Sequence, residues 1–308
     1  LAHPHGPKSL HTPKNSLRHA HMASALKNRV QIQMQSTVGD IDANTHNKIS
    51  TGRSEDKFGI EWTQVNDVIS HVNNLNNIEI AGLAMHIGSQ LTELNPFNDA
   101  FKRLSGLVKD LRRQGQNISR LDLGGGLGIS YDGQPTPTPG EYGKIVNDHF
   151  NDLNCDLLFE PGRFIVGNSG ILVTRVIYVK SNTDRHFLIL DAAMNDLMRP
   201  CLYDAQHTIL PITEAKDQKN LIRFDAVGPV CETGDTFAND IELPATKAGD
   251  LYAILSAGAY GAVMSSSYNS RPIIPEVMVK DDRFSIIREQ ITPEILIKYE
   301  SLPDWKIK

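Results

Sequence analysis

The stretch ISRLDLGGGLG, residues 118–128, decides which fold we expect of this sequence. Its first part is a short apolar run that predicts a strand, and the glycines that follow predict a tight turn at the end of that strand. Two other stretches have the same form: the run 78–86 ends in His86, and the run 156–159 ends in the motif EPGR at 160–163. Apolar residues at helical spacing lie between these strands. Strands that alternate with helices predict parallel β/α units.

Two helices of this β/α part have clear limits in the sequence. The first is expected over residues 62–75, with Thr63 as its cap. The second is expected to begin at Asn95 and to end at Gly115. Its predicted buried stripe consists of Phe97, Phe101, Leu104, Val108 and Leu111.

The second half of the chain has a different pattern. Strand-like runs follow one another with turns between them, at 171–180, 187–190, 221–227 and 251–255. We therefore expect a β/α part over residues 40–172 and a mostly antiparallel β domain over residues 173–308.

Length and composition exclude several classes of protein. The 308 residues allow about two domains, and a hydrophobic fraction of 40% is ordinary for a soluble globular protein. The net charge of −5 gives no general attraction to nucleic acid, and no apolar run is long enough to cross a membrane. The three cysteines have no zinc-like spacing and are odd in number, so we expect neither a metal site nor a disulfide scaffold. A reducing, cytoplasmic compartment fits this cysteine content best.

Residues 1–39 differ from the rest of the chain. They contain five Lys or Arg and no Asp or Glu, and their one apolar pattern is Val30–Met34, which alternates like a strand. An acid-poor targeting peptide is one interpretation, although two arginines in 39 residues support it weakly. We prefer the interpretation that this atypical basic, His/Pro-rich segment is a fragment end or a wrongly translated remnant.

Polar groups end three consecutive strands of the β/α part. The glycine turn could place amides around a phosphate or could merely reverse the chain, and it lacks the spacing of a dinucleotide-binding or P-loop motif. Glu160 and Arg163 place a carboxylate and a guanidinium three residues apart, which suits a charged ligand. His86, with Ser89 close behind it, would alone be read as a structural histidine. We expect chemistry at this edge because β/α-barrel enzymes gather it at the carboxyl ends of their strands.

The β domain adds further candidates. Cys231 lies beside Glu232 in a loop bounded by glycines and could donate a proton instead of packing as a small apolar side chain. Arg199 offers a guanidinium for a carboxylate, with Tyr203 close by. Tyr260 ends another strand among small residues. The serines 265–267 lack the surroundings of a nucleophilic serine.

Five motifs, in this order, resemble the diaminopimelate decarboxylase family of the alanine-racemase-fold enzymes that use pyridoxal 5′-phosphate (PLP). They are HIGSQ at 86–90, LDLGGG at 121–126, EPGR at 160–163, CETGD at 231–235 and AYG at 259–261. The resemblance covers about residues 40–305. It implies an α/β fold with a (β/α)8 PLP-binding barrel, here only its latter half, and a C-terminal, mostly antiparallel β domain. The implied reaction converts meso-2,6-diaminopimelate into L-lysine and CO2, the last step of lysine biosynthesis.

The resemblance also implies a role for each motif. Glu160 would pair with the pyridine nitrogen of PLP, His86 would stack on the ring, and Cys231 would be the proton donor. The remaining cofactor-binding positions would be Ser89, Gly124, Gly125, Gly126, Pro161, Gly162, Arg163 and Tyr260. The substrate-binding positions would be Arg163, Arg199, Tyr203, Glu232 and Tyr260. In relatives the loop with this cysteine reaches the partner's barrel, so a homodimer with shared active sites is implied.

The sequence departs from the family at one position that matters for catalysis. The family's Schiff-base lysine lies in a motif like Ala-Val-Lys-Ala-Asn near the end of the first barrel strand, and Lys8, Lys14 and Lys27 do not match it. We therefore expect this chain to be a truncated form that is inactive alone. Two alternatives stay open: a polyamine-pathway decarboxylase acting on ornithine, arginine or carboxynorspermidine, and an inactive remnant. The glutamate after Cys231 favours diaminopimelate, because polyamine enzymes tend to have an aspartate there.

Overall fold

The computed structural model describes residues 8–10, 30–35, 59–183, 185–214 and 220–306. The chain divides into two compact units. Unit 1 consists of Leu1–Ser130 and Pro135–Phe164, and unit 2 consists of Tyr131–Gln134 and Ile165–Lys308. The chain therefore passes from one unit to the other three times. The domain limits at residues 40 and 172 stay predictions.

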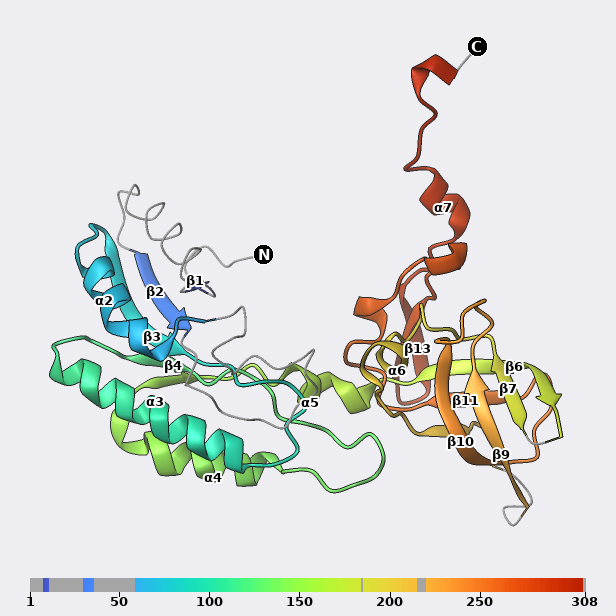
Figure 1. The fold of residues 1–308 in the computed structure, drawn as a ribbon, viewed down its shortest axis with the longest axis horizontal. Coiled ribbons are helices and arrows are strands. Elements are labelled where there is room, and N and C mark those ends of the chain that lie inside the picture. The colour runs from blue at the N-terminus through green and yellow to red at the C-terminus, as the bar shows by residue number, and fades with distance from the viewer. Residues whose placement is uncertain (1–7, 11–29, 36–58, 184, 215–219, 307–308) are drawn as a thin grey trace. The chain divides into compact units, whose positions relative to one another are not determined.

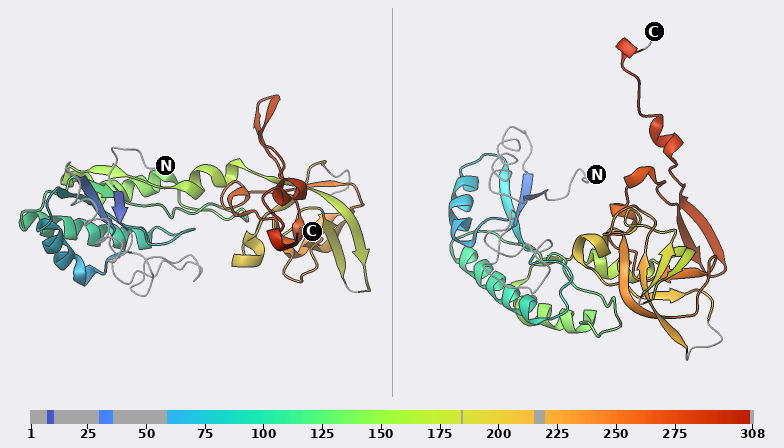
Figure 2. Two further views of the ribbon diagram at one scale, coloured as in Figure 1. Left: turned by 90° about the horizontal axis from the view of Figure 1, so that it is seen from above. Right: turned by 45° about the vertical axis from the view of Figure 1, so that its right-hand side comes forward.

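Unit 1 is built on a five-stranded sheet in which every strand is parallel to its neighbour and the strands follow in chain order (Figure 1). The strands are β1 (Lys8–Leu10), β2 (Val30–Gln35), β3 (Ile78–Ala84), β4 (Arg120–Asp122) and β5 (Asp156–Leu158). Helices α2 (Val65–Asn73), α3 (Asn95–Arg113) and α4 (Pro139–Phe150) lie along one face of this sheet (Figures 1 and 2). Parallel strands in chain order with helices on one side are successive units of a β/α barrel. The expected latter half of a barrel is thus confirmed.

The core of unit 1 lies between the sheet and its helices, with α3 contributing the largest share. The five residues of the predicted stripe, from Phe97 to Leu111, are fully buried, and they belong to one cluster with Leu83 of β3 and Leu121 of β4. Helix α3 begins at Asn95 and gives way to Gly115, whose φ of +87° is the left-handed conformation that ends many helices. The expected start at Asn95 is confirmed, and the helix ends at Arg113, two residues before the expected Gly115.

Other expectations for unit 1 need correction. Thr63 does not cap a helix: residues Trp62–Gln64 form a short 3-10 helix, and α2 begins only at Val65, with Gln64 as its cap. The Thr63 hydroxyl instead donates to Glu61 over 3.5 Å. Helix α4 was not expected, although Thr138 and Glu141 form a capping box around Pro139 that signals its start.

Unit 2 contains a six-stranded sheet of order β10-β9-β7-β6-β11-β8, in which only the pair β7–β9 is parallel. The mostly antiparallel β domain is therefore confirmed. Its strands are β6 (Leu172–Ser181), β7 (His186–Leu190), β8 (Ile209–Pro211), β9 (Leu221–Val227), β10 (Thr236–Pro244) and β11 (Leu251–Ile254). The short helix α6 (Arg199–Tyr203) lies between β7 and β8 in the chain.

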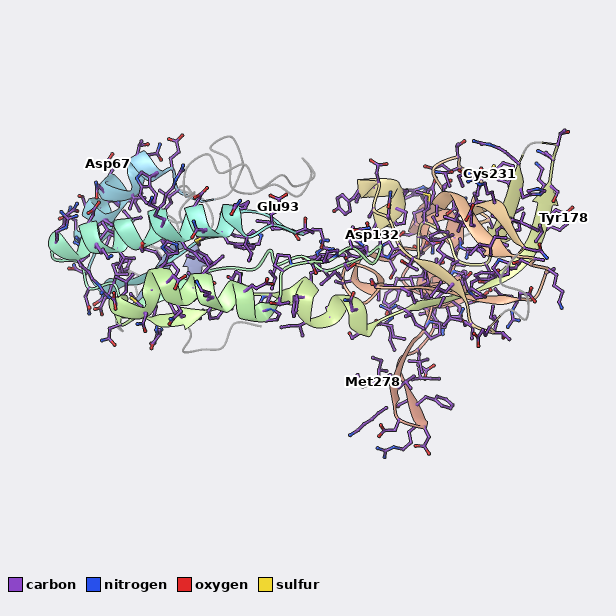
Figure 3. All side chains as sticks on the ribbon, turned by 90° about the horizontal axis from the view of Figure 1, so that it is seen from below. Asp67, Glu93, Asp132, Tyr178, Cys231 and Met278 are labelled. Carbon is purple, nitrogen blue, oxygen red and sulfur yellow. The ribbon has the colours of Figure 1, made fainter. Side chains whose placement is uncertain are left out.

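The end of unit 2 has an extended, two-stranded ribbon. It consists of β12 (Glu276–Lys280) and β13 (Arg283–Arg288), and helix α7 (Pro293–Ile297) follows it. The ribbon exposes large apolar side chains, among them Met278, which Figure 3 labels, and Phe284. The sequence pattern did not indicate either strand, because their side chains do not alternate between a buried and an exposed face.

Most of the N-terminal segment 1–39 lies outside the described residues. The predicted strand Val30–Met34 is confirmed as β2, and Lys8 begins β1, whereas Lys14 and Lys27 are outside the described part. Within that part, no helix is long and apolar enough to cross a membrane.

Candidate active site

His86 follows strand β3, and its ring is oriented by the glycine turn after strand β4. The amide of Gly125 donates to Nδ1 of His86 over 3.3 Å. An imidazole nitrogen that accepts carries no proton, so the proton of the neutral ring is on Nε2. Burial lowers the pKa of His86, against a smaller opposing effect of Asp122. His86 is therefore a neutral, fixed ring at the carboxyl end of the sheet.

Ser89 and Arg163 form a second pair at the same edge. Nη2 of Arg163 donates to the hydroxyl of Ser89 over 3.1 Å, although 74 positions separate them in the chain. Arg163 is only 7% exposed and lies in the short helix α5 (Gly162–Val166), which follows strand β5 after three residues. A buried guanidinium beside a hydroxyl is a suitable donor set for a phosphate.

The glycine turn is packed against both neighbouring loops. A side chain on Gly125 would place its Cβ 2.2 Å from the carbonyl oxygen of Glu160, and one on Gly124 would meet the carbonyl oxygen of Met85 at 2.3 Å. Gly124 and Gly126 also have φ values of +66° and +99°. These glycines are therefore required by backbone contact and conformation, which let three strand ends approach closely.

The EPGR segment is attached to the glycine turn by its first residue. The amide of Glu160 donates to the carbonyl of Gly124 over 2.7 Å, and the amide of Gly162 donates to the carbonyl of Glu160 over 2.8 Å. The Glu160 side chain is exposed, with Pro161 half-buried beside it. Unit 1 thus gathers the predicted residues His86, Ser89, Gly124–Gly126 and Glu160–Arg163 at one edge.

These residues fit the cofactor that the resemblance implies. PLP has a dianionic phosphate, a flat ring and a basic ring nitrogen. The donor set contains a guanidinium–hydroxyl pair and backbone amides for the phosphate, a neutral imidazole face for the ring, and a carboxylate for a protonated nitrogen. Among the described residues, no three His, Cys, Asp or Glu side chains are grouped to hold a metal ion.

In unit 2, Arg199 is a buried cation at the start of helix α6. It is 5% exposed, and its Nη1 lies 2.7 Å from Nε2 of His207. The guanidinium carbon lies 4.3 Å from the centre of the Tyr131 ring. Tyr203 ends the same short helix, one turn later, and is half-buried.

Cys231 and Glu232 are exposed in the loop between β9 and β10 (Figure 3 labels Cys231). The hydroxyl of Tyr268 donates to Oε2 of Glu232 over 2.7 Å. This bond and the negative charge of Glu232 raise the pKa of Tyr268, so the tyrosine stays protonated and orients the carboxylate.

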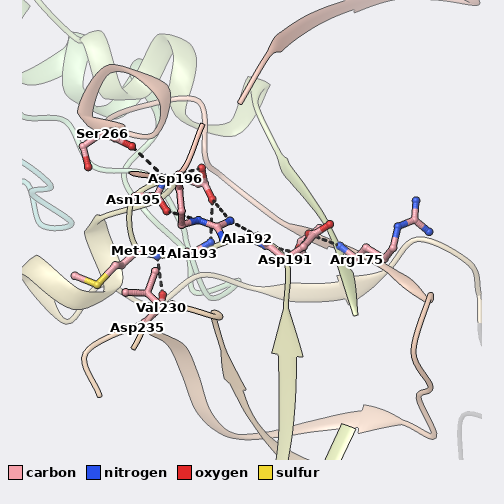
Figure 4. A network of polar contacts seen from close by, with 12 residues as sticks. Arg175, Asp191, Ala192, Ala193, Met194, Asn195, Asp196, Val230, Asp235 and Ser266 are labelled. Carbon is pink, nitrogen blue, oxygen red and sulfur yellow. Dashed lines mark hydrogen bonds and ion pairs between the residues drawn. The ribbon is translucent and has the colours of Figure 1, made fainter. Parts of the chain in front are cut away.

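Asp235 anchors the base of the Cys231 loop. Its two carboxylate oxygens accept from the amides of Met194 and Val230, each over 2.7 Å (Figure 4). Burial raises the pKa of Asp235, although these two amides oppose the effect. The residue just before Cys231 is therefore tied to the segment that leads into the Arg199 helix.

Arg271 also holds this segment, through Asn195, which Figure 4 labels together with Ser266. Nε of Arg271 donates to Oδ1 of Asn195 over 2.9 Å, and Nδ2 of Asn195 donates to the carbonyl of Ser266 over 3.1 Å. Tyr260 lies in the loop before Ser266, is exposed, and has a φ of +56°. The loops that carry Arg199, Cys231 and Tyr260 are thus linked within unit 2.

Sequence reasoning missed the residues that hold the predicted ones. His207, Tyr131, Tyr268 and Asp235 each contact or anchor a predicted residue or its loop. Asp235 belongs to the CETGD motif, but the motif does not indicate its anchoring role. No local signal distinguishes the others: Tyr268 lies 36 positions from Glu232, and the eight positions between Arg199 and His207 span the end of helix α6. The predicted cofactor-binding residues lie in unit 1, except for Tyr260. The predicted substrate-binding residues Arg199, Tyr203 and Glu232 lie in unit 2. Their union in one site stays a prediction.

Fold and strand-end groups together define a class: β/α-barrel proteins that hold a phosphorylated, ring-containing cofactor and carry an additional β domain. Residues 17–167 match the family model described as "Pyridoxal-dependent decarboxylase, pyridoxal binding domain". The match begins within the segment 1–39 that the sequence pattern set apart.

Curated and solved relatives agree with this class. The chain is 45% identical over 268 residues to diaminopimelate decarboxylase of Zymomonas mobilis and 46% identical over 263 residues to that of Pseudomonas aeruginosa. The crystal structure of the Helicobacter pylori diaminopimelate decarboxylase complexed with L-lysine aligns with a TM-score of 0.89 and 35% identity, covering 94% of this chain and 72% of that one. The chain belongs to the diaminopimelate decarboxylase family of pyridoxal-dependent decarboxylases.

The matches do not extend over the whole of the curated relatives. They cover 86% and 85% of this chain but 63% of each of the two curated relatives. The arginine decarboxylase of Paramecium bursaria Chlorella virus aligns with a TM-score of 0.71 at 21% identity, which indicates a shared fold alone.

Proposed function

We propose that these residues belong to the active site of a PLP-dependent decarboxylase that converts meso-2,6-diaminopimelate into L-lysine and CO2. The observation that carries the proposal is the strand-end group of unit 1, where the neutral His86 ring is fixed by Gly125 and the buried Arg163 is paired with Ser89. L-Lysine in the solved Helicobacter pylori relative agrees with the proposed product.

The cofactor residues have separate tasks in this proposal. PLP, when bound, supplies an electron sink for the bond that breaks. Arg163, Ser89, Tyr260, Gly162 and the amides of the glycine turn hold its phosphate, with Pro161 shaping the loop. Glu160 keeps a proton on the ring nitrogen, because a carboxylate favours the cationic form of its partner. His86 supports the ring face as a neutral group.

The substrate residues distinguish the two ends of diaminopimelate. Only one end loses CO2, and the distal end keeps a carboxylate and an ammonium group. Arg199 binds the distal carboxylate and Glu232 the distal ammonium, with Tyr203, Arg163 and Tyr260 around the substrate. The buried position of Arg199 and the orienting bond from Tyr268 to Glu232 support this assignment.

Cys231 supplies the proton that replaces CO2. After CO2 leaves, the substrate carbon must accept one proton, and a positioned side chain donates it faster than bulk water. The exposure of Cys231 supports this role, because a thiol that only packed would be buried.

We infer that the protein is a cytoplasmic homodimer whose loop 231–235 completes the partner's site. The three free cysteines agree with a reducing compartment. The test uses two inactive variants of the fused chain defined in the next paragraph, one without Cys231 and one without the Schiff-base lysine of the added segment. Mixing them should restore about a quarter of the sites, because half of random dimers are mixed and each has one intact site. No recovery from mixed dimers would contradict a shared site.

The test of the reaction uses a fused chain, defined as the N-terminal part of the Zymomonas mobilis relative joined to residues 17–308. The junction is placed where the family match begins. Loaded with PLP, it should release CO2 from meso-diaminopimelate much faster than from ornithine, arginine or carboxynorspermidine. Preferred turnover of one of the latter would replace the proposal by a polyamine-pathway reaction.

A further inference from the structure

His207 and Arg199 are joined in the interior of unit 2. The two side chains are 6% and 5% exposed, and Nη1 of Arg199 lies 2.7 Å from Nε2 of His207. A guanidinium can only donate hydrogen bonds. Nε2 of His207 must therefore be the acceptor, and it carries no proton in this contact.

The second nitrogen of His207 settles the tautomer. Nδ1 lies 2.8 Å from the carbonyl oxygen of Leu255, which can only accept. The ring is thus neutral, donates from Nδ1 to Leu255 and accepts at Nε2 from Arg199. This chain of two hydrogen bonds connects Arg199 to the backbone directly after strand β11.

Tyr131 closes the group from another segment. Its ring meets the His207 ring edge to face, with 4.9 Å between centres and 72° between planes, and lies 4.3 Å from the guanidinium carbon of Arg199. The hydroxyl of Thr208 donates to the Tyr131 carbonyl over 2.9 Å, and the amide of Leu255 donates to the Thr208 carbonyl over 2.9 Å. His207 is therefore fixed on both sides.

The contacts of Arg199 with His207 and Tyr131 suit a cation that binds an anion. A neutral imidazole uses one N–H, leaves the positive charge in place, and fixes the plane of the guanidinium, and the aromatic ring supports the cation without neutralising it.

We propose that His207 is a positioning residue that orients Arg199 toward the distal carboxylate of the substrate, with Tyr131 as a supporting ring. This inference rests on the proposed function, since Arg199 is assigned there to that carboxylate. His207 does not touch the substrate; it acts through Arg199 and so sets selectivity for ligands that carry this carboxylate.

Two conservative variants separate this role from a purely structural one. In His207→Gln the side-chain oxygen reaches about as far as Nε2 and can still accept from Arg199, while the bond to Leu255 is lost. In His207→Asn the side-chain amide reaches about as far as Nδ1 and can still donate to Leu255, while the bond to Arg199 is lost. If His207 positions Arg199, the glutamine variant keeps the selectivity for a ligand with the distal carboxylate and the asparagine variant loses it. If His207 only holds Leu255, the asparagine variant keeps that selectivity and the glutamine variant loses it.

The probes are L-lysine and 1,5-diaminopentane, which differ only by that carboxylate. Their dissociation constants are measured by titration calorimetry on the PLP-loaded fused chain, and selectivity is the ratio of the two values. We expect the parent to prefer L-lysine by about tenfold or more, as one charge-assisted contact can provide. His207→Gln should stay within about threefold of the parent, and His207→Asn should lose most of the preference.

Three outcomes overturn the proposal. The parent shows no selectivity, the His207→Asn variant keeps the parent's selectivity, or the variants weaken the binding of both ligands by the same factor. The ratio compares two ligands on one protein, so a uniform loss of folded protein cancels. CO2 release from the parent tests the proposed function separately. A parent that selects L-lysine but decarboxylates nothing would refute the reaction while the role of His207 stands.

Discussion

At the scale of single residues, the three cysteines allow the proton donor to be tested within one chain. Cys231 is exposed, whereas Cys155 and Cys201 are half-buried, and Cys201 lies beside Arg199 and Tyr203 in α6 with its thiol directed to the Met198 carbonyl over 3.0 Å. We expect Cys231→Ala in the fused chain to lower kcat about 100-fold or more, as loss of a general acid does. The ring absorbance of bound PLP should persist.

Cys201→Ala is the matched control for this prediction, because it removes a thiol from unit 2 without removing the loop thiol. Its kcat should stay within about threefold of the parent. If Cys231→Ala also kept that rate in single-turnover measurements, Cys231 would not be the proton donor.

His86 leads to a prediction about pH. Burial lowers the pKa of His86, so the unfolded chain binds this proton more readily than the folded one, and the free energy of unfolding falls as pH decreases below about 6.5. His86→Asn keeps an oxygen that can accept from Gly125 but does not titrate. Urea unfolding between pH 7.5 and pH 5 should therefore show a smaller loss of stability for His86→Asn than for the parent.

The unfolding measurement can be confined to unit 1. Trp62 packs against the unit 1 core, and Trp305 is the other tryptophan of the chain, so a Trp305→Phe background leaves Trp62 as the fluorescent reporter. Parallel pH profiles for the two proteins would show that His86 is not the group that titrates.

At the scale of elements, alanine substitution of two glycines in unit 1 should change the free energy of unfolding in opposite directions. Gly125→Ala places a methyl group 2.2 Å from the Glu160 carbonyl oxygen and should lower the free energy of unfolding by about 1–3 kcal/mol or more. Gly143→Ala lies in helix α4 with no atom within 4 Å of the new Cβ and should raise it by up to about 1 kcal/mol. Denaturant unfolding of both variants measures the contrast, and equal effects would show that the glycine turn tolerates a side chain.

The same elements show what sequence can and cannot predict. Helix α3 and the strand ends were predictable because burial of one face repeats at a fixed period, and turns need glycine at positive φ. The start of helix α4 was not predicted, although the capping box of Thr138 and Glu141 marks it in the sequence. The bond between Arg199 and His207 spans the end of helix α6, and the Tyr131 ring comes from a distant loop, so no local period encodes either contact.

At the scale of the whole molecule, the missing lysine motif yields a prediction for the 308-residue polypeptide by itself. None of the five parallel strands described in unit 1 ends in a lysine. A covalent link to PLP requires an unprotonated amine within reach of the aldehyde, in a site that the surrounding strands hold in place. We expect no CO2 from meso-diaminopimelate, and no single lysine labelled after borohydride reduction with PLP.

Peptide mapping of the reduced protein decides this last prediction. One stoichiometric pyridoxyl-lysine together with turnover would show that another lysine of these 308 residues serves the reaction. A fused chain that is labelled on the lysine of its added segment is the positive control.

The chain passes between the two units three times, and this has a consequence for protein engineering. Tyr131–Gln134 belongs to unit 2, yet residues of unit 1 precede and follow it in the chain. A single cut at residue 165 would remove Tyr131 from beneath Arg199 and take the acceptor of the Thr208 hydroxyl with it. A graft that transfers substrate preference between relatives must therefore carry two separate gene segments, the short loop 131–134 and the long block from Ile165 onward.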